Sequence, residues 1–352
     1  MELTDKQKQA LYQIVTGVKN NTPEITLGGY AGTGKSVLVS YLTKFFPTFG
    51  VCAYTGKAAN VLRRKGIASA TTIHSRIYKP YFENGVVYFD LTPDPECSGF
   101  IVDEASMVGQ DIYDDLKTFE LPIVFVGDHG QLEPVNSTLN LMSNPDFTLE
   151  EIHRNAGPIA KFAEHLRNGW NPRGFQHEGG EVDFVSNITD EVLTSVNQVI
   201  CAYNKTRVAI NTQIRNALGY TGTINVGERI MCLKNNRHQC LFNGMQGTVV
   251  NLYRGPRGRK LLDFEFDGFI YEGVPYEEDQ FGKESYKIKH GGGAESPNPF
   301  DYAYCVTAHK AQGDEWDDVL VIEQNCKKWS HRRWAYTCAS RARTKLRWKL
   351  AS

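Results

Sequence analysis

The 352-residue sequence predicts an α/β protein with parallel sheets, interrupted by a β-hairpin and by a small all-β insertion. Three observations support this prediction. Short apolar runs alternate with helical patterns, as in parallel sheets that are covered by helices on both faces. An Asn-Gly pair between aromatic residues at 81–90 is the strongest short signal for a hairpin turn. Between 226 and 290, short strands and glycine-rich turns replace the alternation, which indicates an all-β module.

The first part of the chain, residues 1–155, is expected to form one α/β domain. Apolar residues share one face of an N-terminal helix, namely Ala10, Leu11, Ile14, Val15 and Val18. A second, apolar helix runs from Val37 to Phe46. Buried strands are expected where short apolar runs begin, at Ile25, Val51, Phe100 and Ile123. Strands of this kind between helices indicate a parallel sheet.

The rest of the chain divides in the same way. The hairpin is expected within 77–97, with its turn at Asn84 and Gly85. Helix and strand patterns resume in 156–225 and in 300–352, which together are expected to form a second α/β domain. The segment 226–299 is then an all-β insertion in that second domain.

Composition excludes several classes of protein. Lys plus Arg total 39 and Asp plus Glu total 40, so the net charge is −1 and any nucleic-acid binding must come from a local surface. No run approaches the 18 or more apolar residues of a membrane helix, and the polar start of the chain does not resemble a signal peptide. The eight cysteines form no C-x-x-C pair, so we expect no zinc site, reduced thiols and a cytoplasmic location.

A glycine-rich segment follows the first expected strand. Gly29 to Ser36 reads Gly-Tyr-Ala-Gly-Thr-Gly-Lys-Ser, which matches the P-loop pattern G-x-x-x-x-G-K-[ST] between a strand and a helix. Glycines let backbone N–H groups curl around phosphates, and the helix N-terminus adds a positive dipole. Lys35 is expected to reach the β- and γ-phosphates, and Ser36 to ligate Mg²⁺. The residues expected to bind nucleotide here are Gly29, Ala31, Gly32, Thr33, Gly34, Lys35, Ser36 and Val37.

Two adjacent carboxylates end a later apolar strand, Phe100-Ile-Val-Asp103-Glu104. Asp103 is expected to hold the magnesium ion and its water shell. Glu104 is expected to orient or deprotonate the attacking water. Together with the P-loop, this pair predicts a nucleoside triphosphatase.

Further segments follow in a fixed order: Val126 to Pro134, Thr148 to Asn155, Val306 to Gly313 and Tyr336 to Arg343. The whole set resembles superfamily 1 helicases, specifically their RecD/Dda-like branch. The resemblance covers nearly the entire chain, from Leu3 to about Arg347. It implies two RecA-like domains, an SH3-like module at 226–299, and an ATP- and Mg²⁺-dependent motor that moves 5′ to 3′ on single-stranded DNA.

The resemblance also implies roles for single residues around the nucleotide. Gln7 is similar to the glutamine that reads adenine, although its position also fits a helix capping box. Gln131 is similar to the glutamine that senses the γ-phosphate. Arg154 and Arg341 match two arginines that reach the γ-phosphate, where a guanidinium stabilises transferred charge. Gly313 is similar to a residue that lines the nucleotide cleft.

The implied DNA contacts are spread over the chain. Residues of the motifs that touch the DNA backbone in this family are Thr55, Lys57, His74, Asn243, Thr307 and His309. The hairpin at 81–90 is a candidate wedge, whose aromatic residues either stack on a base at the fork or pack beneath the hairpin. A basic and aromatic segment near the end either tracks single-stranded DNA or is structural; it comprises Lys327, Lys328, Trp329, Arg332, Arg333 and Trp334.

Two alternatives to a stand-alone helicase stay open. One is the motor subunit of a recombination nuclease complex. The other, from a different class, is a P-loop small-molecule kinase, which would use Lys35, Ser36 and Asp103 but leave Gln131 and Arg341 without a role.

For the helicase, the expected partners are single-stranded DNA, DNA forks, a single-strand-binding protein or other replication proteins. We expect a monomer that acts away from membranes. The compact chain favours a phage replication or recombination protein in a bacterial cytoplasm.

Overall fold

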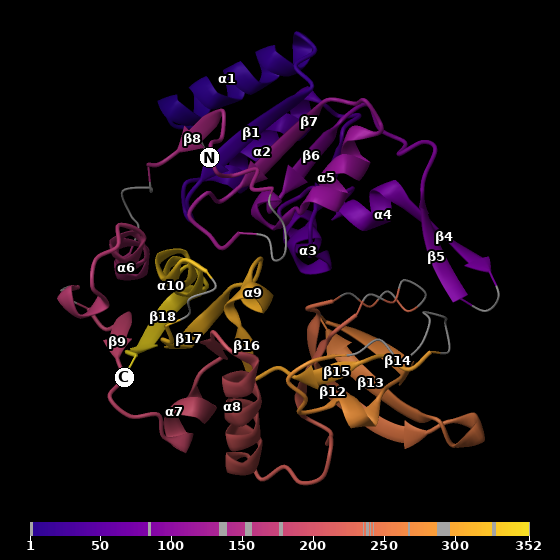
Figure 1. Ribbon diagram of the computed structural model, residues 1–352, viewed down its shortest axis with the longest axis vertical. Helices are drawn as coiled ribbons and strands as arrows, with labels where there is room; N and C mark the ends of the chain where they lie inside the picture. Colours follow the sequence, from indigo (N-terminus) through magenta and orange to yellow (C-terminus); the bar gives the residue numbers. More distant parts are fainter. Residues whose placement is uncertain are drawn as a thin grey trace. The chain divides into compact units, whose positions relative to one another are not determined.

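The chain forms two compact units in a computed structural model (Figure 1). The structure describes residues 3–83, 86–133, 139–151, 157–175, 179–234, 236, 239, 241, 243–266, 268–286, 296–325 and 329–351. Unit 1 comprises Met1–Pro80, Phe89–Phe175 and Trp329–Ser340. Unit 2 comprises Tyr81–Tyr88, Gln176–Lys328 and Arg341–Ser352.

Unit 1 is built on a six-stranded parallel sheet in the order β3-β2-β6-β7-β1-β8. Its strands are β1 (Glu24–Gly29), β2 (Gly50–Ala53), β3 (Thr71–Thr72), β6 (Phe100–Asp103), β7 (Ile123–Gly127) and β8 (Phe147–Leu149). Its helices are α1 (Asp5–Lys19), α2 (Lys35–Phe45), α3 (Gly56–Arg64), α4 (Ile73–Ile77), α5 (Gln110–Lys117), α6 (Pro158–Arg167) and α10 (His331–Ala339), with short 3-10 turns at Ala105–Met107 and Pro172–Gly174.

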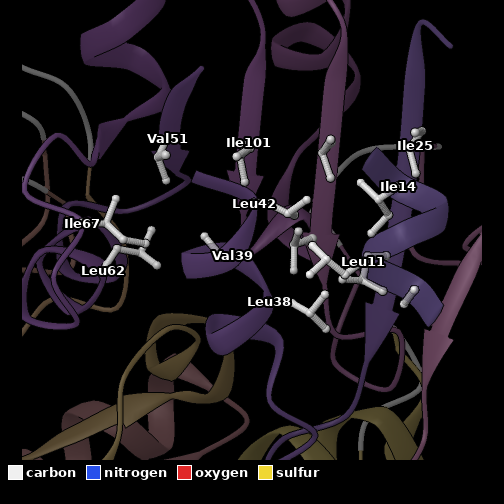
Figure 2. Close-up of a cluster of buried hydrophobic side chains, with 14 of the residues drawn as sticks. Leu11, Ile14, Ile25, Leu38, Val39, Leu42, Val51, Leu62, Ile67 and Ile101 are labelled. Atoms are coloured by element: carbon white, nitrogen blue, oxygen red, sulfur yellow. The ribbon is translucent and has the colours of Figure 1, made fainter. Parts of the chain in front are cut away.

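The strands of unit 1 bury both of their faces, as their apolar sequences predict. Successive residues of β7 belong to two different clusters: Val124 and Val126 to one, Ile123 and Phe125 to the other. The first cluster packs against α1, α2 and α3, and Figure 2 shows side chains such as Leu42 from these helices directed at the strands. Leu42 is fully buried, and burial of such a side chain contributes about 1.5–3 kcal/mol. The second cluster packs against α4 and α5.

Unit 2 contains a five-stranded parallel sheet in the order β16-β10-β17-β18-β9. Its strands are β9 (Val182–Phe184), β10 (Gln198–Cys201), β16 (Cys305–Thr307), β17 (Trp316–Ile322) and β18 (Ala342–Lys349). The helices of this unit are α7 (Asp190–Ser195), α8 (Asn204–Ala217) and α9 (Ala308–Ala311).

The all-β insertion forms an antiparallel sheet in the order β14-β13-β12-β11-β15. Its strands are β11 (Arg229–Cys232), β12 (Gln246–Arg254), β13 (Lys260–Phe266), β14 (Phe269–Pro275) and β15 (Phe300–Tyr302), with 3-10 turns at Pro256–Gly258 and Glu278–Gln280. Two buried ion pairs fasten this sheet to α8: Arg207 with Asp301, and Arg215 with Glu228. The sheet is therefore an integral part of unit 2.

The predicted α/β class, with two parallel sheets and an antiparallel insertion, is confirmed. The hairpin is present as the two-stranded sheet of β4 (Tyr78–Glu83) and β5 (Val86–Leu91). Its turn residues Asn84 and Gly85 lie outside the described residues, and its aromatic side chains are not described. None of the helices in the described part of the chain has the length and apolar character needed to cross a membrane.

Two helices of the predicted second domain, α6 and α10, pack against each other within unit 1. Their placement brings a segment from near the end of the chain to the P-loop.

Candidate functional site

The candidate site lies at one edge of the sheet of unit 1. In the strand register, Ala53 of β2 pairs with Thr72 of β3 and with Asp103 of β6, while Gly28 of β1 pairs with Gly127 of β7. The segments that follow these strands therefore leave the sheet at the same edge. Ligands of open α/β sheets bind outside the carboxyl ends of the strands. Here that edge carries the P-loop, Asp103, the segment after β7, and the predicted DNA contacts Thr55 and His74.

The P-loop backbone has the shape that its glycines allow. Gly32 and Gly34 have positive φ values of 80° and 86°, which side chains with a Cβ rarely adopt. At Gly29, a Cβ would stand 2.8 Å from Thr33 Oγ1 and 3.0 Å from Lys35 Cγ. Gly34 is the residue before α2, so the N-terminus of that helix, with Lys35, Ser36 and Val37 in its first turn, lies at the loop. The N–H of Val37 itself donates to the carbonyl oxygen of Gly34 at 3.0 Å.

Lys35 is folded back onto the loop. Its Nζ atom donates to the carbonyl oxygens of Gly29 at 2.7 Å and Tyr30 at 2.9 Å. A carboxylate oxygen of Asp128 lies 3.9 Å away. The side chain is 17% exposed. The hydrogen-bond partners of its ammonium are therefore two neutral carbonyl oxygens, with one carboxylate at a longer distance. Phosphate oxygens are stronger partners for an ammonium than neutral carbonyls are, so an incoming phosphate can replace them.

Asp128 follows β7 and is almost fully buried. Its Oδ1 accepts from the N–H of Gly130 at 2.9 Å, and its Oδ2 accepts from Gln131 Nε2 at 3.2 Å. The amide of Gln131 is thereby oriented with its Oε1 atom buried and, among the described residues, without a hydrogen-bond partner. A buried acceptor of this kind calls for a donor such as an ordered water.

Asp103 and Glu104 stand where β6 ends. Burial raises the pKa of the Asp103 carboxyl above its ordinary value. The N–H of Glu104, which donates to Asp103 Oδ1 at 3.0 Å, opposes this shift, as do the charges of Lys35 and Lys65. Glu104 has a φ of 55°, a backbone conformation that is unusual outside glycine and that clusters at functional sites. The Asp103 carboxylate and the Ser36 hydroxyl are hard oxygen donors, so these residues fit a magnesium ion.

Gln7 links the N-terminal helix to the P-loop. Its Oε1 accepts from the N–H of Thr4 at 3.0 Å, and the Thr4 hydroxyl accepts from the N–H of Gln7, which completes a capping box. Its Nε2 donates to the carbonyl oxygen of Thr33 at 2.9 Å. An amide has two lone pairs and two N–H donors, so each end of Gln7 can still make one bond to a base.

Tyr336 of α10 is a site residue to which sequence reasoning assigned no role. Its buried hydroxyl donates to Asp128 Oδ2 at 2.8 Å and accepts from the N–H of Ala31 at 2.8 Å. A Cβ at Gly130 would stand 2.9 Å from the Tyr336 ring, so glycine permits this close approach. One hydroxyl therefore joins the P-loop to the carboxylate that orients Gln131. The signals in the sequence were that Asp128 and Tyr336 each lie in one of the ordered segments, at 126–134 and 336–343.

The start of α10 is also held against this site. Arg333 donates to the carbonyl oxygens of His129 at 3.1 Å and Gln131 at 3.0 Å, and the Thr337 hydroxyl accepts from the N–H of Leu132. Trp334 is fully buried. Of the two interpretations of the basic and aromatic segment, the structural one therefore applies to Arg333 and Trp334, while Lys327 and Lys328 lie outside the described residues.

The predicted DNA contacts of unit 1 lie at the same sheet edge. Thr55 is the residue before α3, and its hydroxyl accepts from the N–H of Ala58. His74 stands between two aromatic rings, with centroid distances of 6.4 Å to Tyr54 and 5.5 Å to Tyr78. The backbone of Lys57 is in the first turn of α3; its side chain is not described.

A second group of predicted residues gathers in unit 2. Asn243 Oδ1 accepts from Lys310 Nζ at 2.6 Å, and Lys310 follows His309 on α9. Thr307 is the residue before that helix, and Gly313, with a φ of 79°, lies shortly after it. Burial lowers the pKa of His309 and also that of Lys310. Lys310 was missed from the sequence, although it lies inside a quoted motif.

Of the two arginines predicted to reach the γ-phosphate, the structure describes one. Arg341 belongs to unit 2, is 4% exposed, and donates to the carbonyl oxygen of Asp314 at 3.1 Å. Arg154 lies outside the described residues.

Unit 1 thus defines a P-loop nucleotide-binding protein: a parallel sheet, a glycine-rich loop before a helix, a lysine in the loop, and carboxylates after two neighbouring strands. The sequence profile of the AAA domain family matches residues 2–187, and that of the UvrD-like helicase C-terminal domain matches residues 302–347.

Relatives of known name narrow this class. The ATP-dependent RecD2 DNA helicase of Deinococcus radiodurans is 27% identical over 356 residues, which cover 92% of this chain and 46% of the relative. The ATP-dependent DNA helicase dda of Enterobacteria phage T4 is 29% identical over 249 residues, which cover 61% of this chain and 57% of the relative. This chain thus spans about half the length of the curated relatives it matches.

Solved structures share the fold. Pif1 helicase from Bacteroides in complex with ADP-AlF3 and single-stranded DNA matches 99% of this chain and 93% of its own, with a TM-score of 0.64 at 18% identity. A structure of two coordinating Pif1 helicases at forked DNA also has a TM-score of 0.64, at 19% identity, over 99% of this chain and 92% of its own. The chain belongs to the AAA domain family. It is similar in sequence to the RecD2 and dda helicases, and it shares its fold with the Pif1 structures. The predicted resemblance is confirmed.

Proposed function

We propose that this chain is an ATP-dependent 5′-to-3′ DNA helicase or translocase, which couples ATP hydrolysis to movement on single-stranded DNA and to duplex unwinding. The observation that carries the proposal is the shared sheet edge of unit 1. The P-loop, Asp103 and Gln131 lie on the same edge as Thr55 and His74, so a change at the nucleotide and a change at the DNA act on one rigid sheet. The names of the RecD2 and dda relatives support the same activity.

The chemistry assigned to each residue follows from its contacts. Lys35 exchanges its two carbonyl partners for phosphate oxygens of ATP. Ser36 and Asp103 would hold Mg²⁺, which would neutralise charge on the phosphates. The Oε1 atom of Gln131, which has no partner within the described part of the chain, accepts a hydrogen bond from the attacking water, and Glu104 orients or deprotonates that water.

Two arginines, two groups of DNA contacts and the hairpin have the remaining proposed roles. Arg154 and Arg341 stabilise charge on the transferred phosphoryl group. DNA phosphates contact Thr55, Lys57 and His74 in unit 1, and Asn243, Thr307 and His309 in unit 2. The hairpin of β4 and β5 serves as the wedge at the fork. Because two groups of contacts hold the strand, ATP binding and hydrolysis can tighten one while the other is released.

The proposed setting is a monomer on single-stranded DNA and forks in the cytoplasm, with single-strand-binding and other replication proteins nearby. The experiment that tests the proposal is ATP turnover without nucleic acid, with single-stranded DNA, and with RNA. We expect strong stimulation by DNA and loss of turnover in Lys35→Ala, with an unchanged thermal unfolding curve. Turnover that is indifferent to nucleic acid would contradict the proposal and favour a small-molecule kinase. Turnover stimulated by DNA without any unwinding would indicate a motor subunit of a larger complex.

A further inference from the structure

A second lysine, outside the P-loop motif, reaches Ser36, one of the residues proposed to hold magnesium. Lys65 Nζ donates to the hydroxyl oxygen of Ser36 at 3.1 Å. Its charge also acts on the Asp103 carboxylate, where it opposes the effect of burial. One ammonium therefore hydrogen-bonds the hydroxyl of Ser36, and its charge, like that of Lys35, favours the ionised form of Asp103.

The position of Lys65 is set by the end of α3. Its N–H donates to the carbonyl oxygens of Val61 and Leu62, each at 3.1 Å, and Gly66 then ends the helix with a φ of 95°. Leu62 is 1% exposed in the core of unit 1, so the backbone from which the Lys65 side chain extends is fixed. The side chain itself is exposed, and its ammonium lies beside α2. The core therefore fixes where the side chain starts, and the long side chain remains free to leave Ser36.

An ammonium and a divalent cation compete for these oxygens. Both are attracted by the same carboxylate and hydroxyl lone pairs, and two cations a few ångströms apart repel each other strongly in a partly buried site. A nucleotide changes this balance, because its di- or triphosphate brings enough negative charge for the metal and the two lysines together.

We propose that Lys65 is a placeholder cation, which binds the Ser36 hydroxyl before nucleotide enters and keeps a divalent metal out until nucleotide enters with it. The inference rests on the proposed Mg²⁺·ATP site and goes beyond it, because it assigns to Lys65 the order in which metal and nucleotide bind. Lys65 is a positioning residue for the metal site, not one that touches the reacting phosphate.

The test is the binding of Mn²⁺, measured by electron paramagnetic resonance on the full chain without and with ADP. Mn²⁺ accepts the same oxygen ligands as Mg²⁺. Without nucleotide, Lys65→Gln should bind Mn²⁺ about tenfold or more tightly than the unsubstituted chain does. Lys65→Arg keeps the charge and should behave as the unsubstituted chain.

Two further variants locate the effect. Lys44→Gln removes the same charge from the other end of α2, about 12 Å along the helix, and should leave Mn²⁺ binding unchanged. Adding Asp103→Asn to Lys65→Gln should abolish the gain in affinity, because the carboxylate ligand is lost.

The outcomes separate the inference from the function on which it rests. If Lys65→Gln and the unsubstituted chain bind Mn²⁺ equally without nucleotide, while both bind it with ADP, the placeholder role is wrong and the nucleotide site stands. If the unsubstituted chain binds no Mn²⁺ even with ADP, the proposed metal and nucleotide site is itself wrong. A gain confined to Lys65→Gln supports the inference.

Discussion

Removing one hydroxyl from Tyr336 should weaken both the fold and the chemistry of unit 1. In Tyr336→Phe the carboxylate of Asp128 loses a donor at 2.8 Å, and the N–H of Ala31 loses its acceptor at 2.8 Å. A bond to a charged group, and a buried N–H left without a partner, are each worth about 1–3 kcal/mol. Because the two bonds share one hydroxyl, we expect a loss of about 2–4 kcal/mol in the free energy of unfolding.

The effect on turnover should exceed what the loss of stability explains. Asp128 orients Gln131 and lies 3.9 Å from the ammonium of Lys35, so its displacement moves both groups. Small displacements of catalytic groups are costly, and we expect kcat to fall by about ten- to a hundredfold with a smaller change in KM. Urea unfolding and ATP turnover with saturating single-stranded DNA measure the two effects at a temperature where the variant is folded.

Tyr113→Phe is the matched control. Its hydroxyl also bonds a carboxylate, Glu24 Oε2 at 2.7 Å, but on α5 and away from the P-loop, and Lys117 remains bonded to that carboxylate at 3.1 Å. We expect a loss of about 0.5–1.5 kcal/mol in stability and normal turnover. If Tyr336→Phe keeps full turnover, or if both variants lose the same fraction of it, the hydroxyl does not connect the P-loop to the catalytic residues.

Other residues give further tests. Gln131→Ala should lower kcat by about a hundredfold with little change in nucleotide affinity, since only the attacking water is misplaced; equal losses in kcat and affinity would argue against that role. Glu228→Ala should cost about 3–5 kcal/mol in urea unfolding, because its buried arginine partner keeps an uncompensated charge, whereas Asp317→Ala, which breaks an exposed pair, should cost less than about 1 kcal/mol. Burial lowers the pKa of Lys310 below its ordinary 10.5, so this lysine loses its charge at a lower pH than a surface lysine. Affinity for single-stranded DNA should therefore begin to fall at a pH below the ordinary lysine pKa of 10.5, and less so in Lys310→Arg, which stays charged; identical pH profiles would exclude a phosphate contact. Arg341→Ala should bind ATP but hydrolyse it slowly, because its charge matters most in the transition state, and an unchanged kcat would remove it from the catalytic set.

The sequence predicted those parts of the fold that depend on local patterns. Apolar runs such as Ile123 to Val126 are buried on both faces and form parallel strands, as their lack of alternation indicates. The P-loop could be predicted because its glycines have local conformational reasons. Gln131 and His74 were found through motifs of a recognisable family; they follow strands of unit 1 as expected, and their roles stay predictions. These motifs follow strand ends, which the topology then brings to one edge.

What the sequence did not predict depends on contacts between distant segments. Asp128 and Tyr336 are 208 positions apart, so no local pattern links them. The same holds for Lys65, whose role depends on where α3 ends relative to α2 and on a long side chain that is exposed. Arg333 and Trp334 are the opposite case, in which a local pattern suggested a role that the contacts do not support. Their basic and aromatic pattern is typical of DNA binding, but here the two side chains hold α10 in place.

The central claim is that turnover at the P-loop drives movement of defined polarity along DNA. The most direct test is ATP-dependent unwinding of two duplexes that differ only in whether the single-stranded tail is 5′ or 3′, with Lys35→Ala as the inactive control. We expect the unsubstituted chain to unwind only the duplex with the 5′ tail, and Lys35→Ala to unwind neither duplex. Unwinding from the 3′ tail alone, or equal unwinding from both tails, would contradict it.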